Sequence, residues 1–279
     1  MKTISSPEKM SAACTVLKSK KQTIGFVPTM GALHEGHLTL IRTAKRFCDK
    51  VVVSIFVNPT QFGPKEDYKK YPRNFKKDSA LLKKEGVNYN FLPSNISIYP
   101  EGYKTFVEVG DLGKILCGIS RPDHFKGVAT IVAKLFNIVK PDMAFFGAKD
   151  FQQQAIIRKM VQDLNMGIKI FTVPTVREQD GLAMSSRNAY LSEKERKTAP
   201  ALYRALKYGK KLIESGRTDP KIVISKLRSL ISKENLFKID YIEIRDPATL
   251  EKLKKRRGKA LIALAVYLGR TRLIDNIVV

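Results

Sequence analysis

The 279 residues include no tryptophan and only three cysteines and three histidines. The cysteines, Cys14, Cys48 and Cys117, are odd in number and far apart in the chain, and no CxxC pair occurs. Neither a zinc site nor a redox-active cysteine couple is therefore indicated. We predict three reduced and mostly buried thiols.

Long apolar runs are also missing. The longest, at 51–57 and 260–269, fall well short of the roughly 20 residues that a membrane-spanning helix needs. The opening residues, MKTISSPEKM, contain no apolar stretch of signal-peptide length, so we expect a cytoplasmic protein with no membrane partner. Hydrophobic residues still make up 43% of the chain, which is enough for the core of one large or two moderate domains.

Acidic residues are scarce, because 26 Asp and Glu stand against 51 Lys and Arg and leave a formal net charge of +25. Such an excess can attract nucleic acid or small anions. It peaks in EKLKKRRGKA at 251–260, where no aromatic residues alternate with the basic ones as base-stacking platforms would. We favour a solvated helix end or loop, and nucleic acid is not an expected partner.

Four short runs rich in β-branched and aromatic residues lie at 23–29, 51–58, 143–147 and 168–174. They lack period-two alternation, as expected of strands that are covered on both faces of a parallel sheet. Segments with helical periodicity lie between them, the clearest at 125–139. Residues 1–187 are therefore predicted to form an α/β domain, a doubly wound parallel sheet of the Rossmann-like type.

The last third has a different pattern. Helical periodicity extends over 191–216 and 219–234, and strand-like segments then follow one another at 240–246, 260–269 and 271–279. Successive strands without helices between them indicate an antiparallel sheet. We therefore predict a second, smaller α+β domain over 188–279.

Ligands of a doubly wound sheet bind beyond the carboxyl ends of its strands. The first run is followed by His34 and His37, which share one face if the segment is helical. Gly36 allows close approach to the backbone, and a helix start offers unpaired N–H groups to phosphate. A histidine pair can also cap a helix or bind a metal, but no nearby cysteine or histidine supplies a third ligand.

The later turns carry further polar groups. Lys149 could neutralise phosphate, and the hydroxyls and guanidinium of 184–187 suit a triphosphate, although each would fit an ordinary solvated loop as well. Gln61 and Gln153 are neutral amides suited to orienting a substrate. Gln153 is in phase with Ile157, Met160 and Leu164, so we predict that it points inward, as a core glutamine also would.

The HxGH motif followed far downstream by MSSRN resembles the signatures of nucleotidyltransferases related to class I aminoacyl-tRNA synthetases. The fuller set of motifs resembles the pantothenate synthetase (pantoate–β-alanine ligase) family over nearly the whole chain. That family usually has FVNPMQF and GEKD where this chain has Thr60 and Ala148. The motifs are PTMGALHEGH at 28–37, FVNPTQF at 56–62, YPR at 71–73, HFKGVAT at 124–130, FFGAKDFQQ at 145–153 and MSSRNAYL at 184–191.

The resemblance implies that ATP drives the condensation of (R)-pantoate with β-alanine through a pantoyl adenylate, releasing AMP and diphosphate. Mg²⁺ would arrive with the ATP. The family is typically a cytoplasmic homodimer whose smaller domain closes over the site.

It also implies roles for particular residues. His37 would be the proton donor, with His34 and Lys149 as further catalytic residues. Gln61 and Gln153 would bind pantoate, Gln61 would also bind β-alanine, and Asp78 would be an outer ligand of the metal. The ATP-binding residues would be Met30, Gly31, Ala32, Leu33, His34, Glu35, Gly36, His37, Gly147, Ala148, Lys149, Asp150, Val176, Met184, Ser185, Ser186 and Arg187.

Two alternatives remain at this stage. Another HxGH nucleotidyltransferase, transferring adenylate to a phosphate ester, would need neither glutamine and would not depend on β-alanine. An RNA-binding module using the +25 charge would not need the histidines or Ser185.

Overall fold

The computed structural model describes residues 1–64, 66–216, 219–254 and 258–279. The basic run predicted to be solvated therefore lies partly outside the described residues, since 255–257 are not among them. The chain divides into two compact units. We call Met1–Ala148 with Gln153–Pro174 the amino-terminal unit, and Lys149–Gln152 with Thr175–Val279 the carboxyl-terminal unit.

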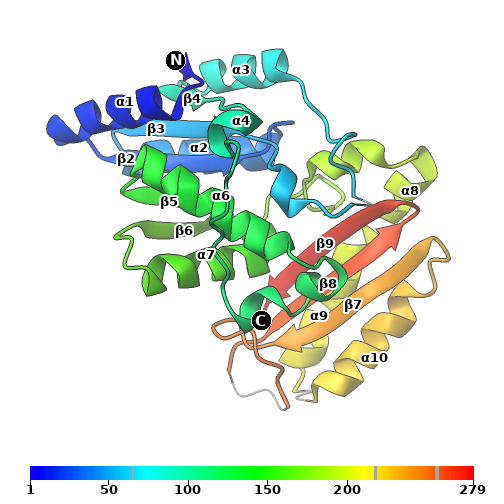
Figure 1. Cartoon of the computed structure of the whole chain (residues 1–279). Helices are drawn as coiled ribbons and strands as arrows, with labels where there is room; N and C mark the ends of the chain where they lie inside the picture. The colour runs from blue at the N-terminus through cyan, green and yellow to red at the C-terminus, as the bar shows by residue number, and fades with distance from the viewer. Residues whose placement is uncertain (65, 217–218, 255–257) are drawn as a thin grey trace. The chain divides into compact units, whose positions relative to one another are not determined.

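The amino-terminal unit contains a six-stranded sheet in the order β1-β4-β3-β2-β5-β6 (Figure 1). Every neighbouring pair is parallel, which confirms the predicted doubly wound parallel sheet. The short strands β1 and β4 were not predicted. The bounds are β1 (Lys2–Ile4), β2 (Ile24–Thr29), β3 (Lys50–Ile55), β4 (Tyr89–Phe91), β5 (Met143–Gly147) and β6 (Lys169–Val173).

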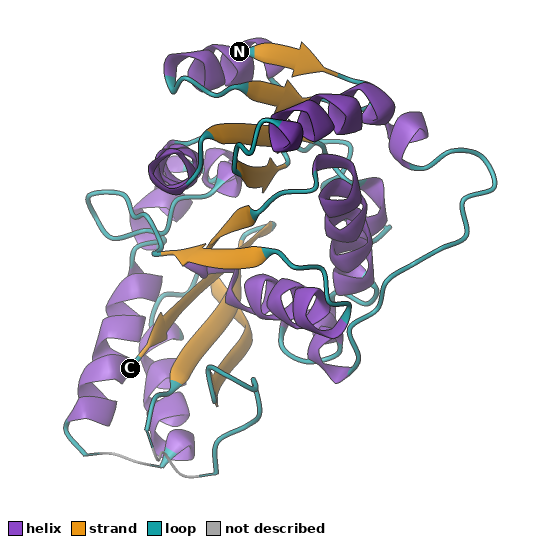
Figure 2. Cartoon of the chain, turned by 90° about the vertical axis from the view of Figure 1, so that its left-hand side faces the viewer, coloured by secondary structure: helices purple, strands orange, loops and turns teal. Residues whose placement is uncertain are grey.

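Both faces of this sheet are covered by helices, as Figure 2 also shows. Phe26 of β2 packs edge-on against Phe136 of α6 (His124–Val139), with ring centroids 6.2 Å apart. Its neighbour Val27 lies in a cluster with Ile41 and Ala44 of α2 (Glu35–Phe47). Because adjacent residues of a strand point to opposite faces, α6 and α2 cover opposite faces. This double burial explains why the strand sequences do not alternate.

The remaining helices of this region include α7, which crosses from one unit to the other. It ends at Asp163, so Leu164 lies beyond it and is 53% exposed; the prediction that Leu164 shares the buried face was wrong. The other bounds are α1 (Pro7–Ser19), η1 (Pro59–Gln61), α3 (Phe75–Lys84), α4 (Asn95–Ile98), η2 (Asp111–Gly113), α5 (Cys117–Ser120), η3 (Ala148–Asp150) and α7 (Phe151–Asp163).

All three cysteines are free and buried, as predicted. Removal from water penalises the charged thiolate, and burial raises the pKa of Cys14 and of Cys48 to about 11 each. These two thiols are therefore protonated at neutral pH and behave as small apolar side chains.

The carboxyl-terminal unit contains a three-stranded antiparallel sheet in the order β7-β8-β9. Leu206 and Leu227 from two helices pack with Ile244 and Leu264 of the sheet in one core. The predicted α+β architecture with an antiparallel sheet is confirmed. The bounds are η4 (Ser186–Tyr190), α8 (Glu193–Thr198), α9 (Ala201–Glu214), α10 (Pro220–Ile231), β7 (Phe237–Arg245), β8 (Leu261–Leu268) and β9 (Thr271–Val278).

One detail of this unit differs from the sequence analysis. The helix predicted over 191–216 is two helices, because Pro200 has no N–H and stands between them as the N-cap of α9. Ser192 and Glu195 form a capping box on α8. The domain boundary at 187/188 stays a prediction; the carboxyl-terminal unit includes residues from Thr175 onward, among them Arg177, which pairs with Asp275 of β9.

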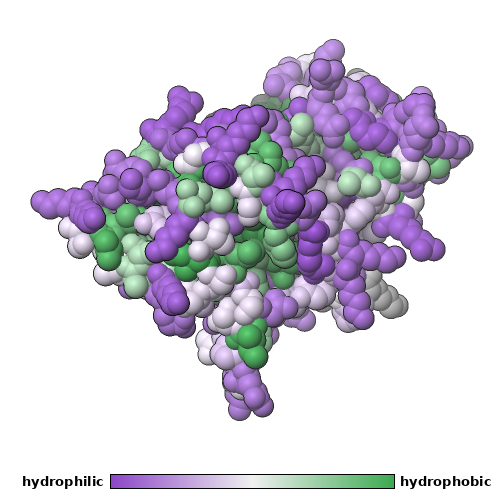
Figure 3. Space-filling model, turned by 90° about the horizontal axis from the view of Figure 1, so that it is seen from above, coloured by the Kyte–Doolittle hydropathy of each residue, from purple (hydrophilic) through white to green (hydrophobic). Residues whose placement is uncertain are grey.

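Within the described part of the chain, no helix is long and apolar enough to cross a membrane. Figure 3 shows hydrophilic residues projecting from one face of the molecule, with hydrophobic residues visible between them. That the excess of basic residues does not bind RNA stays a prediction from the sequence.

Candidate functional site

The topology places two of the predicted turns side by side. Strands β2 and β5 are neighbours, and the strand order runs away from them in both directions. Because the strands are parallel, β2 and β5 end at the same edge, which is the switch point where doubly wound folds bind ligands. Met30–His37 follow β2, and Gly147 and Ala148 lie at the end of β5.

The turn after β2 is held by a buried carboxylate. Gly31 and Ala32 have φ of +82° and +50°, a conformation that non-glycine residues rarely adopt. Asp78 of α3 is 1% exposed, and its two oxygens accept hydrogen bonds from the amides of Ala32 (2.9 Å) and Leu33 (2.8 Å). The role of Asp78 as an outer metal ligand stays a prediction, whereas its contact with this turn was missed.

The two histidines after this turn cap α2. His34 is the N-cap, and its Nδ1 accepts from the amide of Gly36 at 3.2 Å. The Nδ1 of His37 accepts from the amide of His34 at 3.3 Å, and the two ring centroids are 4.1 Å apart. An accepting Nδ1 leaves the proton of a neutral imidazole on Nε2. Each ring therefore caps the helix with one nitrogen and keeps a donor on the other.

The helix start differs from the prediction in one respect. The amides of His34 and Gly36 bond to imidazoles, and that of His37 bonds to the carbonyl of His34 at 2.8 Å. The expected unpaired N–H groups are thus occupied at these three positions, because the side chains form a capping box. Nε2 of each ring is the nitrogen that does not take part in these capping contacts.

Gln61 lies beside the first turn. It belongs to η1, which follows β3, the neighbour of β2. Its Nε2 donates to Sδ of Met30 at 3.0 Å, and its Oε1 accepts from Nδ2 of Asn58 at 3.2 Å. The side chain is 8% exposed, so its amide is held in one orientation. The structure thus brings together Gln61, which follows β3, and Met30, which follows β2.

Asn58 connects η1 to its surroundings. Besides Gln61, its Nδ2 donates to the carbonyl of Gly127 at 3.1 Å, and its Oδ1 accepts from the hydroxyls of Tyr99 (2.8 Å) and Thr60 (3.0 Å). Burial raises the pKa of Tyr99 to about 12, so this hydroxyl keeps its proton and remains a donor. The Thr60 hydroxyl adds a further hydrogen bond to this network.

The third histidine, His124, also positions η1, a role that the sequence analysis missed. Its Nδ1 lies 2.8 Å from the carbonyl oxygen of Gln61, which can only accept. In the neutral ring Nε2 then accepts from Arg121 at 2.9 Å. Arg121 in turn forms a bidentate pair with Glu66, at 2.7 and 2.6 Å. This chain of contacts fixes the backbone that carries the Gln61 amide.

Close packing of α6 on η1 depends on Gly127. A Cβ at this position would lie 2.3 Å from the carbonyl oxygen of Thr60 and 2.7 Å from the amide nitrogen of Gln61. Both are backbone atoms that cannot rotate away. The motif HFKGVAT is thus explained by contact between α6 and the Gln61 segment.

We expect Gly127→Ala to lower the free energy of unfolding by about 1–3 kcal/mol, the usual cost of overpacking. The matched control is Gly63→Ala, since a Cβ there would meet only the Glu66 side chain at 3.7 Å. Urea denaturation of both variants measures the difference. Equal stability of the two would contradict the close-approach argument.

Gln153 is half-buried on α7, so the predicted inward orientation holds only in part. Its neighbours Gln152 and Gln154 are each 6% exposed. Gln154 accepts from the hydroxyl of Thr172 at 2.8 Å and from Arg158 at 3.2 Å. Gln154 is thus a satisfied core glutamine, and the amide that remains partly accessible is that of Gln153.

The carboxyl-terminal unit holds the other predicted residues. The amide of Met184 donates to the carbonyl of Val176 at 3.0 Å, so these two form the base of one short hairpin. The hydroxyl of Ser185 accepts from the amide of Arg187 at 3.3 Å and caps η4, which also contains Ser186. The half-buried Lys149 and Asp150 belong to the same unit.

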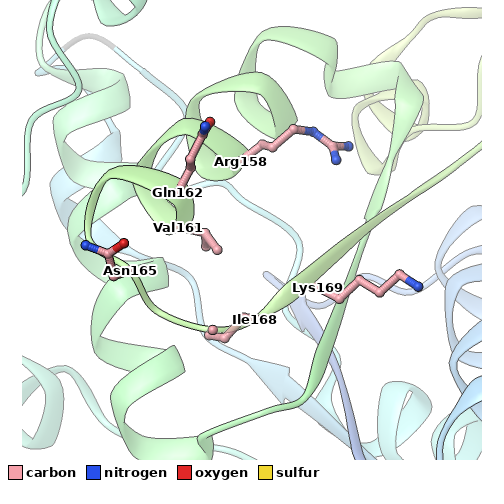
Figure 4. Close-up of a pocket in the computed structure, with 7 residues that line it drawn as sticks. Arg158, Val161, Gln162, Asn165, Ile168 and Lys169 are labelled. Carbon is pink, nitrogen blue, oxygen red and sulfur yellow. The ribbon is translucent and has the colours of Figure 1, made fainter.

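A shallow hollow lies elsewhere in the amino-terminal unit, at the end of α7 and the start of β6 (Figure 4). It is at the amino end of β6, opposite the edge where doubly wound folds bind ligands. Its lining contains no acidic residue, histidine or cysteine, so we place no chemistry there. The lining residues are Arg158, Val161, Gln162, Asn165, Gly167, Ile168 and Lys169.

Comparison with known proteins agrees with this geometry. The family model for pantoate-beta-alanine ligase matches residues 2–278. A pantothenate synthetase from Caldicellulosiruptor bescii is 56% identical over 98% of this chain and 96% of its own length. The solved structure of pantothenate synthetase from Thermus thermophilus is 44% identical, covers 99% of both chains and superposes with a TM-score of 0.94.

A second solved structure is that of a pantoate-beta-alanine ligase from Francisella tularensis, complexed with beta-gamma ATP and beta-alanine. It is 37% identical, covers 99% of this chain and 97% of its own, and superposes with a TM-score of 0.81. The match extends over every motif named above. By sequence, fold and the arrangement of these motifs, the chain belongs to the family of pantoate–β-alanine ligases.

Proposed function

We propose that this chain condenses pantoate with β-alanine in two steps. A carboxylate oxygen of pantoate attacks the α-phosphorus of MgATP, and diphosphate leaves as pantoyl adenylate forms. The amine of β-alanine then attacks the acyl carbon, loses a proton, and expels AMP. No protein nucleophile is needed, so the enzyme acts by positioning the reactants and stabilising charge.

The observation that carries this proposal is the capped histidine pair at the switch point of the sheet. With Nδ1 of each ring accepting a backbone hydrogen bond, Nε2 is a fixed donor for phosphate oxygens. His37 then stabilises the charge that develops as diphosphate leaves, and His34 binds beside it. Mg²⁺ enters as part of the nucleotide, held by phosphate oxygens and water.

The pantoate side is assigned to the two glutamines. The buried Gln61 amide is fixed by Asn58 and Met30, so it can distinguish a hydroxylated carboxylate from other acids at little entropic cost. We assign Gln153 to pantoate and Gln61 also to β-alanine. The reported Francisella complex with beta-gamma ATP and beta-alanine supports ATP and β-alanine as ligands.

The remaining assignments concern the nucleotide. The backbone of the Met30–His37 turn and Gly147–Asp150 would contact ATP, Lys149 would neutralise phosphate charge, and Val176 with Met184–Arg187 would complete the binding residues. We further propose that the protein is cytoplasmic and forms a homodimer. Light scattering of the purified chain tests the dimer.

The decisive experiment measures AMP formation from MgATP. We expect AMP only when pantoate and β-alanine are both present, and diphosphate release in a single turnover with pantoate alone. Turnover with a phosphate ester in place of pantoate, without need for β-alanine, would instead favour another nucleotidyltransferase. RNA binding without either reaction would overturn the enzyme assignment.

We expect Gln153→Ala to raise the KM for pantoate roughly 10-fold, because a hydrogen bond to a charged ligand contributes about 1.5–3 kcal/mol. The KM for ATP should stay nearly unchanged. The matched control is Gln154→Ala, whose side chain is occupied by Thr172 and Arg158; it should alter stability but not the pantoate KM. An effect of Gln153→Ala confined to ATP would move the residue to the nucleotide side.

A further inference from the structure

Strand β9 carries two buried polar residues in succession. Asp275 is 3% and Asn276 is 8% exposed, and consecutive residues of a strand point to opposite faces of the sheet. Leu273, two residues before Asp275, packs in the core with α9 and α10, so Asp275 faces the helices and Asn276 faces the other way. Buried polar groups persist where they are hydrogen-bonded, so their partners indicate what they support.

Asp275 holds Arg177 from the helix side. The guanidinium forms a bidentate pair with the carboxylate, at 2.7 and 2.9 Å, and donates to the carbonyl of Gly181 at 3.1 Å. Its centre also lies 3.7 Å from the centroid of the Tyr203 ring of α9. Such a planar, stacked and bidentate arrangement leaves the arginine little freedom.

Arg177 is part of the short hairpin that includes Val176 and Met184. Arg177 follows Val176 directly and pairs with Ala183 in an antiparallel bridge. Val176 and Met184, both assigned to ATP, are joined by the hydrogen bond described above. By fixing Arg177, Asp275 therefore fixes Val176 and Met184, the two residues that would contact the nucleotide.

Asn276 holds Lys149 from the other face. Its Nδ2 donates to the carbonyl oxygen of Lys149 at 2.9 Å. Its own amide donates to Oδ1 of Asp275 at 2.8 Å, the oxygen that also receives Arg177. The two anchoring contacts thus share one carboxylate, although they act on segments from distant parts of the sequence.

We propose that Asp275 and Asn276 are positioning residues for ATP, with Asn276 setting the backbone of Lys149 and Asp275 setting the Val176–Met184 hairpin through Arg177. The inference rests on the proposed function, because it needs Lys149 and the hairpin to bind the nucleotide. The pantoate glutamines belong to the other unit, so the effect should be specific to ATP.

The test uses Asn276→Ala, which removes the side-chain hydrogen bond to the Lys149 carbonyl and leaves the buried ion pair of Asp275 and Arg177 in place. We expect the rate of adenylate formation at subsaturating ATP to fall about 10-fold or more, since a misplacement of about 1 Å can cost roughly 10²-fold. The KM for pantoate should stay within twofold of the parent's. Thr271→Ala, which removes another buried polar group of β9, is the control and should change neither.

A double-mutant cycle with Lys149→Ala separates positioning from general destabilisation. If Asn276 acts through Lys149, its replacement should have almost no further effect in the Lys149→Ala background. An unchanged ATP dependence in Asn276→Ala, or an equal loss in both backgrounds, would overturn the inference. Arg177→Lys tests the other arm and should raise the ATP KM alone. A parent chain without pantoate-dependent AMP formation would refute the proposed function itself.

Discussion

Replacing His37 with alanine is expected to lower the rate of adenylate formation by roughly 10²–10³, the loss seen when one preorganised donor to a developing charge is removed. The reason is that Nδ1 of His37 is committed to the amide of His34, so Nε2 is held as a donor before ATP arrives. Single-turnover formation of pantoyl adenylate from MgATP and pantoate measures this step alone. ATP binding should weaken much less.

Loss of the helix cap must be separated from loss of the donor. The His37 cap contact contributes on the order of 1 kcal/mol to stability, so urea denaturation of His37→Ala should show only a modest shift and a folded protein under assay conditions. Wild-type adenylation in this folded variant would show that His37 is a cap residue only.

Asp78→Ala is expected to produce the largest loss of stability at the site. It removes the acceptors of the Ala32 and Leu33 amides, and each buried amide left without a partner costs about 1–3 kcal/mol. The turn with positive φ at Gly31 and Ala32 would then relax, and the histidines that follow it would shift. We expect a loss of about 2–5 kcal/mol in unfolding free energy together with slower adenylation.

Asp78→Asn is the companion variant, because it keeps one acceptor oxygen in the same place and should recover part of the stability. A magnesium titration distinguishes the two roles of this residue. If Asp78 is an outer metal ligand, excess Mg²⁺ should restore adenylation by the variants. If it holds the turn, Mg²⁺ should restore nothing. Unchanged stability of Asp78→Ala would contradict the structural role.

The site was predictable from sequence wherever its signal is local. The apolar runs of β2 and β3 reveal buried parallel strands, and a histidine three residues after another places both on one helix end. The topology rule then brings the strand ends together. These features depend on residues within a few positions of one another, so periodicity and spacing suffice to find them.

The tertiary structure alone decided what holds those residues in place. Asp78 reaches a turn 45 residues away, His124 reaches the Gln61 carbonyl across 63, and Asn276 reaches Lys149 across 127. A hydrogen bond between residues far apart in the chain produces no periodicity or fixed spacing in the sequence. A single Asp or Asn in the sequence therefore does not reveal whether it is buried or which residue it contacts. The sequence by itself therefore predicted which groups would meet the substrates. Only the folded chain determined which buried groups orient them, because that depends on which side chains the packing of strands and helices brings within hydrogen-bonding distance.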